Sequence, residues 1–512
     1  MNTTRSTTLG DGLHTLGRWP REVASRTPHR IAVEDGAGAL SYAELDARAE
    51  ALARTLRQSG CRPGDRIATL TANCADHIVL LFACAKARLI LVPLSWRLAA
   101  REIADQLADA EPALLLAHPA HAGLATAALA RLPEPPRRST LGRAGIEGGE
   151  PASAGELEPV ADDDPLLLLY TSGTSGRAKG VPLSQANCFW TNLSLSRAVP
   201  LTAEDVVLSV LPQFHIGGWN VQPLLACWVG ATVILEHGFN PGRILDLIAR
   251  RGVTTMMGVP ANYLFLAENP AFAGTDLSSL RTVIVGGAPM PEALLRTWHA
   301  RGVTLVQGYG LSEAAPNVLC LPAERAADKL GFAGRPYPYV EVAVADQDTG
   351  AIHPDATDRA VDGELLVRGP NVFTGYWRDA AATASAIRDG WLRTGDLVHR
   401  DADGYYRIID RVDDMFVSGG ENVFPSEVEN ALHGHPSVAE AAVVATPDER
   451  WGTVGLAFVV RRAGATATEA DLIAHCRTEL AGFKVPREVR FVAELPHSAV
   501  GKLLRRNLRD DQ

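Results

Sequence analysis

Apolar positions in the first part of the chain recur in two alternating patterns. Ser41 and Glu44 form a capping box, and four apolar residues from Leu45 to Leu56 then fall on one helical face that ends at Gly60. Short apolar runs at 67–70, 89–92 and 113–117 follow, with helical segments between them. This alternation predicts buried parallel strands covered by helices, which is an α/β architecture.

The later part of the chain repeats this pattern and then departs from it. Strand candidates recur at 232–235, 254–258, 282–285 and 304–307, whereas 133–164 lack periodicity and predict a surface connection. Residues 340–376 are rich in turns and predict a small β-rich subdomain. A helix from Pro425, strands near 438–445 and 455–460, and a helix over 469–480 predict a small α+β unit.

Length and composition limit the class of protein. A chain of 512 residues is too long for one ordinary core, so we expect at least two domains. Hydrophobic residues make up 46% and charged residues 21%, which is typical of a soluble globular protein. The net charge of −10 argues against a nucleic-acid partner held by bulk charge, although it permits a local basic patch.

Cysteines and apolar stretches bear on compartment and membrane. The seven cysteines are scattered and never in C-x-x-C spacing, so reduced thiols in a cytoplasmic compartment are favoured over zinc or disulfide sites. The first residues have no apolar core, which argues against a signal peptide. The most apolar stretch, 77–94, is interrupted by Lys86 and Arg88 and predicts a helix and strand rather than a membrane span.

The most informative motif is YTSGTSGRAKGV at 170–181, directly after the apolar run 166–169. Its glycines allow backbone N–H groups to close around an anion, and its hydroxyls and one lysine add donors and positive charge. The spacing is not that of a P-loop, because Lys179 is followed by Gly180 and has no glycine directly before it. The motif predicts a polyphosphate cradle, and a flexible Gly/Ser loop is the alternative.

Further motifs, in the same order along the chain, resemble the adenylate-forming superfamily of acyl-CoA synthetases, peptide-synthetase adenylation domains and luciferases. They are QFHIGG at 213–218, GYGLSE at 308–313, RTGDL at 393–397, DRVDD at 410–414, SGGEN at 418–422 and GK at 501–502. The resemblance covers essentially the whole chain and is closest to benzoate-type and fatty-acid CoA ligases.

The resemblance implies a fold and a reaction. Residues 1–411 would form an AMP-binding domain of layered α/β subdomains with a β-rich subdomain, and 412–512 a small mobile α+β domain. A carboxylate would attack ATP in the presence of Mg²⁺, giving an acyl-adenylate and pyrophosphate. The small domain would then rotate about Asp413, and the thiol of coenzyme A would attack the adenylate and expel AMP.

The resemblance also assigns roles to individual charged residues. Lys502, otherwise an ordinary tail lysine, would bridge the carboxylate and the α-phosphate during adenylation. Glu313, otherwise a first-turn glutamate, would hold Mg²⁺. Tyr309 would lie against adenine, Asp396 would accept the ribose hydroxyls, and Arg411 would support the ribose or phosphate side.

Other residues match the positions that line the nucleotide and the pantetheine arm. For the nucleotide these are Thr171, Ser172, Gly173, Thr174, Ser175, Gly176, Lys179, Gly287, Ala288, Gly308, Gly310 and Ser312. For coenzyme A they are Ser418, Gly419 and Gly420, with Trp451, Phe483, Lys484 and Arg487 as further candidates that could equally be surface packing and solvated charges.

The acyl pocket implied by the resemblance is apolar. It would draw on His215, Trp219, Met257, Gly258, Gly286, Gly308 and Ala315. His215 stands where amino-acid-activating relatives carry an aspartate, which disfavours amino-acid substrates, although a lone histidine in an apolar stretch is usually a core residue. Trp219 would close the far end of the pocket or pack in the core. Without a second charge, the pocket favours an aryl or medium-chain acyl carboxylate.

Three alternatives stay open on the sequence. A carrier-protein ligase would load a protein-bound phosphopantetheine thiol instead of coenzyme A, and a luciferase-like oxygenase would share the fold. A non-catalytic nucleotide sensor would also bind ATP, but the presence of Lys502 and Glu313 argues against it. The expected partners are a small carboxylic acid, ATP and coenzyme A, with no nucleic acid and no membrane span; a homodimer is possible.

Overall fold

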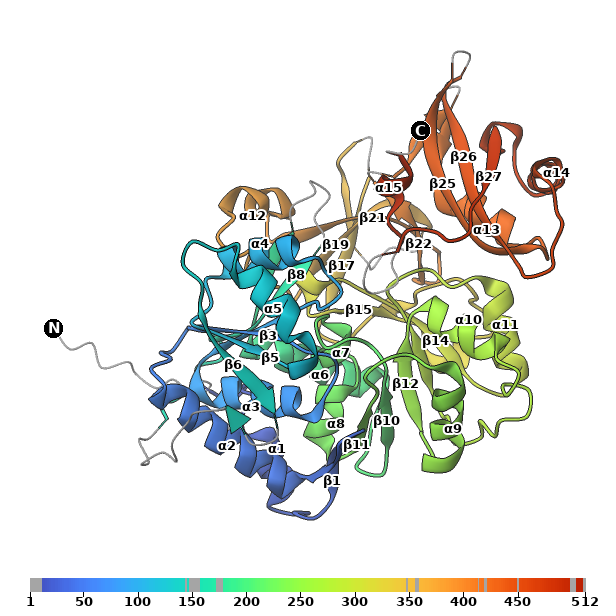
Figure 1. Cartoon of the computed structure of the whole chain (residues 1–512). Helices are drawn as coiled ribbons and strands as arrows, with labels where there is room; N and C mark the ends of the chain where they lie inside the picture. Colours follow the sequence, from blue (N-terminus) through green and yellow to red (C-terminus); the bar gives the residue numbers. More distant parts are fainter. Residues whose placement is uncertain are drawn as a thin grey trace.

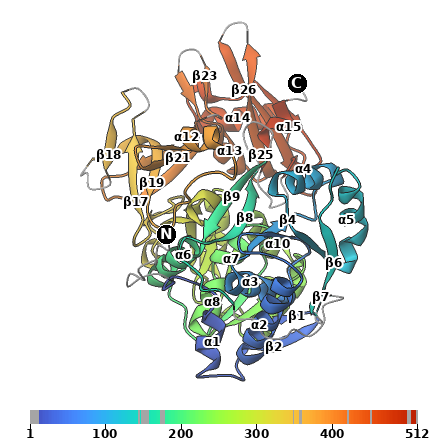
Figure 2. The same ribbon diagram turned by 90° about the vertical axis from the view of Figure 1, so that its left-hand side faces the viewer.

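The computed structural model describes residues 12–142, 145–146, 157–171, 178–346, 349–354, 359–412, 414–418, 421–448, 451–497 and 503–509. Two large sheets with helices around them form the body of the molecule, and a β-rich sheet joins this body to a small C-terminal unit. Figures 1 and 2 both show the C-terminal unit at the opposite end of the molecule from α1 and α2.

A seven-stranded sheet forms the first layered unit, in the order β7-β6-β5-β3-β4-β8-β9. Its strands are β3 (Arg66–Leu70), β4 (Ile90–Leu94), β5 (Leu114–Ala117), β6 (Arg137–Gly142), β7 (Gly145–Ile146), β8 (Pro165–Thr171) and β9 (Lys179–Ser184). The helices of this part of the chain are α1 (Trp19–Ala24), α2 (Tyr42–Gln58), α3 (Ala75–Ala87), α4 (Ala100–Ala110), η1 (Pro119–His121), α5 (Ala122–Leu129) and α6 (Gln185–Ala198).

The predicted capping box is confirmed at the start of α2. The Ser41 hydroxyl accepts a hydrogen bond from the Glu44 amide, and the Glu44 carboxylate accepts one from the Ser41 amide. The apolar face predicted from Leu45 to Leu56 is buried. It packs on α3, which is buried along its whole length.

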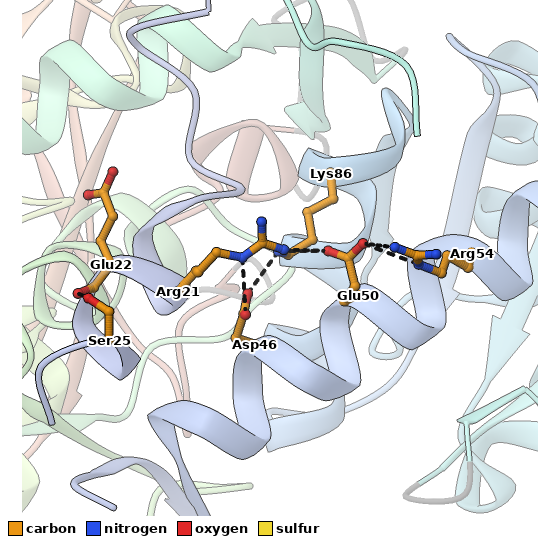
Figure 3. Close-up of polar contacts among 7 residues, drawn as sticks. All are labelled: Arg21, Glu22, Ser25, Asp46, Glu50, Arg54 and Lys86. Atoms are coloured by element: carbon orange, nitrogen blue, oxygen red, sulfur yellow. Dashed lines mark hydrogen bonds and ion pairs between the residues drawn. The ribbon is translucent and has the colours of Figure 1, made fainter. Parts of the chain in front are cut away.

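A network of charges joins α1, α2 and α3 at this contact (Figure 3). Lys86, on the otherwise apolar α3, places Nζ 2.8 Å from Asp46 Oδ1 and 3.1 Å from Glu50 Oε2. Arg21 and Arg54 bond the same carboxylates from the more exposed side. The buried ammonium is therefore compensated within the helix packing, as a buried charge requires.

A nine-stranded sheet forms the second layered unit, in the order β16-β15-β14-β13-β12-β10-β11-β1-β2. Its strands are β1 (Ile31–Asp35), β2 (Gly38–Ser41), β10 (Val206–Ser209), β11 (Thr232–Leu235), β12 (Thr255–Gly258), β13 (Val283–Val285), β14 (Leu305–Gly310), β15 (Asn317–Cys320) and β16 (Arg335–Pro336). The helices are α7 (Gly217–Asn220), α8 (Pro223–Val229), α9 (Pro241–Arg251), α10 (Pro260–Glu268), α11 (Glu292–Ala300), η2 (Ser312–Ala314) and η3 (Ala323–Arg325).

Antiparallel pairing dominates the β-rich sheet that follows. It contains β17 (Glu341–Ala345), β18 (Ile352–Pro354), β19 (Val361–Arg368), β20 (Ile387–Arg388), β21 (Trp391–Arg400) and β22 (Tyr406–Arg411), with α12 (Ala380–Ala386) before β20. The sheet continues to Arg411, well beyond the end predicted at residue 376, because β21 pairs with β19 and β22 pairs with β21.

The C-terminal unit has cores of its own. Its elements are β23 (Phe416–Ser418), β24 (Glu421–Val423), α13 (Pro425–His433), β25 (Val438–Asp448), β26 (Gly452–Arg461), α14 (Glu469–Glu479), η4 (Gly482–Lys484), β27 (Glu488–Phe491) and α15 (Arg505–Arg509). Its two core clusters contain only residues from 416 to 508, whereas the other clusters contain only residues up to 406.

Most predicted elements are confirmed, and the predicted α/β class with a β-rich subdomain and a small α+β unit is confirmed as well. Besides the end of the β-rich subdomain, two predictions are wrong. The stretch 133–164 contains strands β6 and β7, because short polar strands near a sheet edge carry no strong periodicity. Strand β14 runs to Gly310 rather than ending at residue 307 as predicted.

Two further findings concern the chain as a whole. All seven cysteines are buried free thiols. No helix in the described ranges combines the length and the apolar composition that crossing a membrane requires.

Candidate active site

The site lies at the carboxyl ends of β12, β13 and β14, which run parallel and adjacent in the nine-stranded sheet. Gly258 ends β12, Gly286 follows β13, and Gly308 lies in β14. A Cβ atom on Gly286 would lie 2.9 Å from Met257 Cε and 3.1 Å from the Gly308 oxygen. Gly286 therefore has no room for a side chain. Ligands of open α/β sheets usually bind at this carboxyl edge.

Gly310 sets the path of the chain from β14 into η2, which carries Glu313. A Cβ atom at this position would lie 1.9 Å from the Pro316 oxygen, so no other residue fits the close backbone approach. Ala315 follows η2 with φ 64° and is fully buried. The Asn220 amide donates to the Ala315 carbonyl at 2.9 Å, which ties this turn to α7.

Two side chains donate hydrogen bonds to the Asp396 carboxylate. The Tyr309 hydroxyl donates to Asp396 Oδ2 at 2.5 Å, and Arg411 Nη1 donates to Oδ1 at 3.0 Å. Asp396 and Arg411 are cross-strand partners on β21 and β22. Burial, together with the Asp396 carboxylate, raises the pKa of Tyr309 well above its usual value, so its hydroxyl stays a donor. The residues predicted for adenine and ribose thus lie together.

Tyr376 joins two other predicted residues. Its hydroxyl donates to Glu313 Oε1 at 2.8 Å, and the Lys179 ammonium lies 4.9 Å from the centroid of its ring. Glu313 and Lys179 form no ion pair with each other. Both charged side chains are half-buried and are held by one neutral aromatic side chain.

The predicted phosphate loop connects β8 to β9 in the sequence, and these two strands pair antiparallel. Thr171 and Lys179 are cross-strand partners at its base, and both are half-buried. The backbone of Gly180 is covered by Trp377, whose amide donates to the Gly180 oxygen at 2.8 Å. The remaining predicted loop residues lie outside the described ranges: Ser172, Gly173, Thr174, Ser175 and Gly176.

His215 lies in the turn between β10 and α7. Gly218 is required there, because a Cβ atom would lie 2.3 Å from the Pro212 oxygen. Burial, reinforced by the positive charge of Arg97, lowers the pKa of His215 to about 3. The imidazole is therefore neutral at physiological pH, which suits a residue beside an apolar acyl group better than a general acid.

Trp219 has no exposed surface, and its ring centroid lies 4.9 Å from that of His77 at an angle of 76°. In this conformation it packs in the core, which is the second of the two alternatives drawn from the sequence. At the carboxyl end of β13, Gly287 is exposed with φ 82°, and Ala288 is half-buried. Ser312, in η2, is half-buried as well.

The residues predicted for coenzyme A are only partly described. Ser418 is buried in β23, Trp451 is 44% exposed, and Lys484 Nζ lies 2.7 Å from Glu427 Oε1. Lys484 is thus already neutralised within the small domain. Asp413, Gly419, Gly420 and Lys502 lie outside the described residues.

Sequence reasoning missed Tyr376. The residue stands in Gly375-Tyr376-Trp377, inside a segment interpreted only as β-rich, with no chemical partner nearby in the chain. Its partners Lys179 and Glu313 are 197 and 63 positions away. A tyrosine flanked by glycine and tryptophan in a turn-rich segment was the only signal, and it is a weak one.

Two family models match the chain. That of the AMP-binding enzymes matches residues 20–377, and that of the AMP-binding enzyme C-terminal domain matches 427–502. The chain belongs to the AMP-binding enzyme family. The predicted resemblance to adenylate-forming acid–CoA ligases is thereby confirmed.

Curated relatives of this AMP-binding enzyme match nearly end to end. It is 41% identical to a feruloyl-CoA synthase from Amycolatopsis sp, over 96% of this chain and 98% of that protein. It is 37% identical to an indoleacetate–CoA ligase from Aromatoleum aromaticum, over 96% and 97%. It is 35% identical to the fatty acid–[acyl-carrier-protein] ligase ScoC from Streptomyces coeruleorubidus, over 97% and 96%.

Solved structures agree with this AMP-binding enzyme in fold. ATP-bound MatB from Rhodopseudomonas palustris has a TM-score of 0.87 and 34% identity, covering 97% of this chain and 98% of that one. The o-succinylbenzoate coenzyme A synthetase from Bacillus subtilis, in complex with ATP and magnesium ion, has a TM-score of 0.85 and 30% identity, over 96% and 99%.

The described part of the site fits a magnesium ion held mainly by substrate. Of the Glu313 carboxylate, only Oε1 is engaged by described residues, through Tyr376. No group of three potential ligating side chains gathers anywhere in the described ranges. Mg²⁺ commonly binds through one or two carboxylates together with the phosphates of a nucleotide, so a single carboxylate beside a phosphate loop suits it.

Proposed function

We propose that this protein is an AMP-forming acid–CoA ligase that activates an aryl carboxylate or, as the second choice, a medium-chain acyl carboxylate. One observation supports the proposal: residues from three separate segments of the chain meet through two tyrosines, with Tyr309 bonded to Asp396 and Tyr376 lying between Glu313 and Lys179. Asp396 and Tyr309 bind the nucleoside end, and Lys179 and Glu313 bind the phosphate end.

The first step joins the acid to AMP. The carboxylate oxygen attacks the α-phosphorus of ATP, the bond to the bridging oxygen breaks, and pyrophosphate leaves. Lys179 and the N–H groups of the 172–176 loop neutralise the phosphate oxygens, and Lys502 stabilises the charge that develops during attack. Bound at Glu313, Mg²⁺ would screen the triphosphate and the leaving pyrophosphate.

The second step needs the small domain. The thiol of coenzyme A attacks the acyl carbon of the mixed anhydride, the thiol proton passes to solvent, and AMP leaves with the former carboxylate oxygen. We propose residues 1–411 and 412–512 as the two domains and Asp413 as the hinge between them. The separate core clusters on either side of this residue support the division, because each unit keeps its packing when it rotates.

The acyl group would lie beside His215, Gly258, Gly286 and Gly308. A neutral His215 offers no charge of its own to a substrate ammonium or a second carboxylate. The two relatives with 41% and 37% identity are named for aromatic acids, feruloyl and indoleacetate. These observations favour an aryl acid over a fatty acid.

The main alternative within this function concerns which thiol accepts the acyl group. The relative with 35% identity acts on an acyl-carrier protein, so a protein-bound phosphopantetheine is the second candidate. An oxygenase that oxidises the adenylate, as in luciferases, shares the fold. A cytoplasmic location and the possible homodimer remain predictions from the sequence.

Pyrophosphate release tests the proposal across a panel of aromatic, fatty and dicarboxylic acids, with no thiol, with coenzyme A and with a phosphopantetheinylated carrier protein. We expect release with aryl acids and AMP formation at turnover rates only when coenzyme A is added. AMP formation at such rates with the carrier protein alone would establish the alternative acceptor. No release with any acid would contradict the proposed function.

A further inference from the structure

Residues 373–377 run between the two segments that handle phosphate and magnesium in the proposed function. At one end, the Phe373 amide donates to the backbone oxygen of Glu313 at 2.8 Å. At the other, the Trp377 amide donates to the backbone oxygen of Gly180 at 2.8 Å, directly after Lys179. These two hydrogen bonds fix the backbone of η2 relative to the backbone of the β8–β9 hairpin. We call residues 373–377 the strut.

The strut is itself anchored firmly. Gly375 has φ 148°, and a Cβ atom on it would lie 2.5 Å from Thr383 Cγ2. The Tyr376 amide donates to Thr383 Oγ1 at 2.9 Å, and the Tyr376 ring packs edge-on against Phe373 at 5.0 Å. The Trp377 indole donates to the Asp109 oxygen at 3.2 Å. These contacts fix the backbone and the ring of Tyr376.

The side chain of Tyr376 contacts the same two segments that the strut backbone joins. Its hydroxyl holds one oxygen of Glu313 and leaves the other available among the described residues, while its ring face carries the Lys179 ammonium. The Tyr376 hydroxyl is the donor in this pair, because an ionised carboxylate can only accept hydrogen bonds. A neutral spacer of this kind also prevents Glu313 and Lys179 from neutralising each other.

We infer that Tyr376 is a positioning residue for Mg²⁺-dependent nucleotide binding: its hydroxyl orients the Glu313 carboxylate toward the metal, and its ring fixes Lys179 toward the phosphates. The inference rests on the proposed function, since it needs a Mg·ATP complex at this site. Hydrogen-bonding partners of a metal-ligating carboxylate typically contribute a factor of about 10 to 100 in metal affinity.

Two substitutions separate the two contacts. Tyr376→Phe removes the hydroxyl but keeps the ring beneath Lys179, whereas Tyr376→Leu removes both. Tyr42→Phe is the control for loss of a hydrogen-bonded tyrosine hydroxyl, because the hydroxyl of the fully buried Tyr42 donates to the Ala226 and Ala231 carbonyls and touches no residue of the site. Its loss should lower stability without affecting the nucleotide.

The measurement is equilibrium binding of a non-hydrolysable ATP analogue by titration calorimetry, at fixed nucleotide and varied Mg²⁺, with no acid present. We expect Tyr376→Phe to raise the Mg²⁺ concentration for half-maximal binding about tenfold while binding without Mg²⁺ is unchanged. Tyr376→Leu should weaken both. Thermal unfolding of each variant reports loss of structure separately.

The inference is overturned if Tyr376→Phe has the Mg²⁺ requirement of the unmodified protein, or one shifted no further than that of Tyr42→Phe. Unmodified protein that binds the analogue with no Mg²⁺ dependence would overturn it as well. Unmodified protein that does not bind the analogue at all would instead contradict the proposed function.

Discussion

Two charge clusters in this molecule use the same residue types to different ends. In the α1–α3 network, Lys86 contacts Asp46 and Glu50 directly, and arginines complete the pairing (Figure 3). At the sheet edge, Glu313 and Lys179 are held apart by the neutral Tyr376. Charges that neutralise each other support packing, whereas charges held by neutral groups stay available to a ligand.

The largest expected effect comes from a residue whose charge would serve only the ligand. Lys502→Ala should slow acid-dependent pyrophosphate release about 10²–10³-fold, the usual loss for a positioned transition-state donor. Thioester formation from a supplied acyl-adenylate should be spared, and the midpoint of thermal unfolding should not change. If both half-reactions slowed equally, Lys502 would not have the proposed role.

The backbone that carries Glu313 should tolerate no added side chain. Gly310→Ala forces a Cβ atom against the Pro316 oxygen, and we expect about 3 kcal/mol of destabilisation by urea unfolding. Gly123→Ala is the control, because Gly123 lies in helix α5 with nothing within 4 Å of its added Cβ and should become slightly more stable. Equal unfolding midpoints for the two variants would refute the close approach at Gly310.

A reciprocal pair of substitutions tests the comparison itself. Lys86→Met leaves two carboxylates without their buried cation and should cost about 3 kcal/mol of stability, with ATP affinity unchanged. Asp396→Ala removes the acceptor proposed for the ribose hydroxyls and should weaken ATP binding about 10- to 100-fold, with a smaller loss of stability. If Lys86→Met weakened ATP binding as much as Asp396→Ala does, the α1–α3 network and the candidate nucleotide site would not have separate roles.

The smallest expected effect concerns acid stability. Burial lowers the pKa of His77 to about 3, against about 6.5 in the unfolded chain. Between these two pKa values the unfolded state binds a proton that the folded state does not. The contribution of the neutral His77 to the free energy of unfolding is therefore fully present above pH 6.5 and is lost as the pH falls toward 3. His77→Gln should reduce the stability difference between pH 7 and pH 5 by about 2 kcal/mol. An unchanged difference in urea unfolding would contradict the buried neutral imidazole.

The sequence was informative where chemistry or periodicity is local. The capping box at Ser41, the buried strands and the motif residues Tyr309 and Asp396 follow from short stretches of chain. Contacts made only by folding could not be found this way. Tyr376 gains its role from Lys179 and Glu313, and Trp219 is assigned to the core only by its packing on His77. Short polar strands near a sheet edge, such as β6, were not predicted because they lack a periodic pattern.

Transfer of ¹⁸O tests the central claim most directly. The accepted acid, labelled with ¹⁸O in its carboxyl group, is incubated with ATP, Mg²⁺ and coenzyme A, and the AMP is analysed by mass spectrometry. Attack of the carboxylate on the α-phosphorus predicts one ¹⁸O atom in each AMP and none in pyrophosphate. Unlabelled AMP, or label in a released phosphate or pyrophosphate, would contradict acyl-adenylate formation at this site.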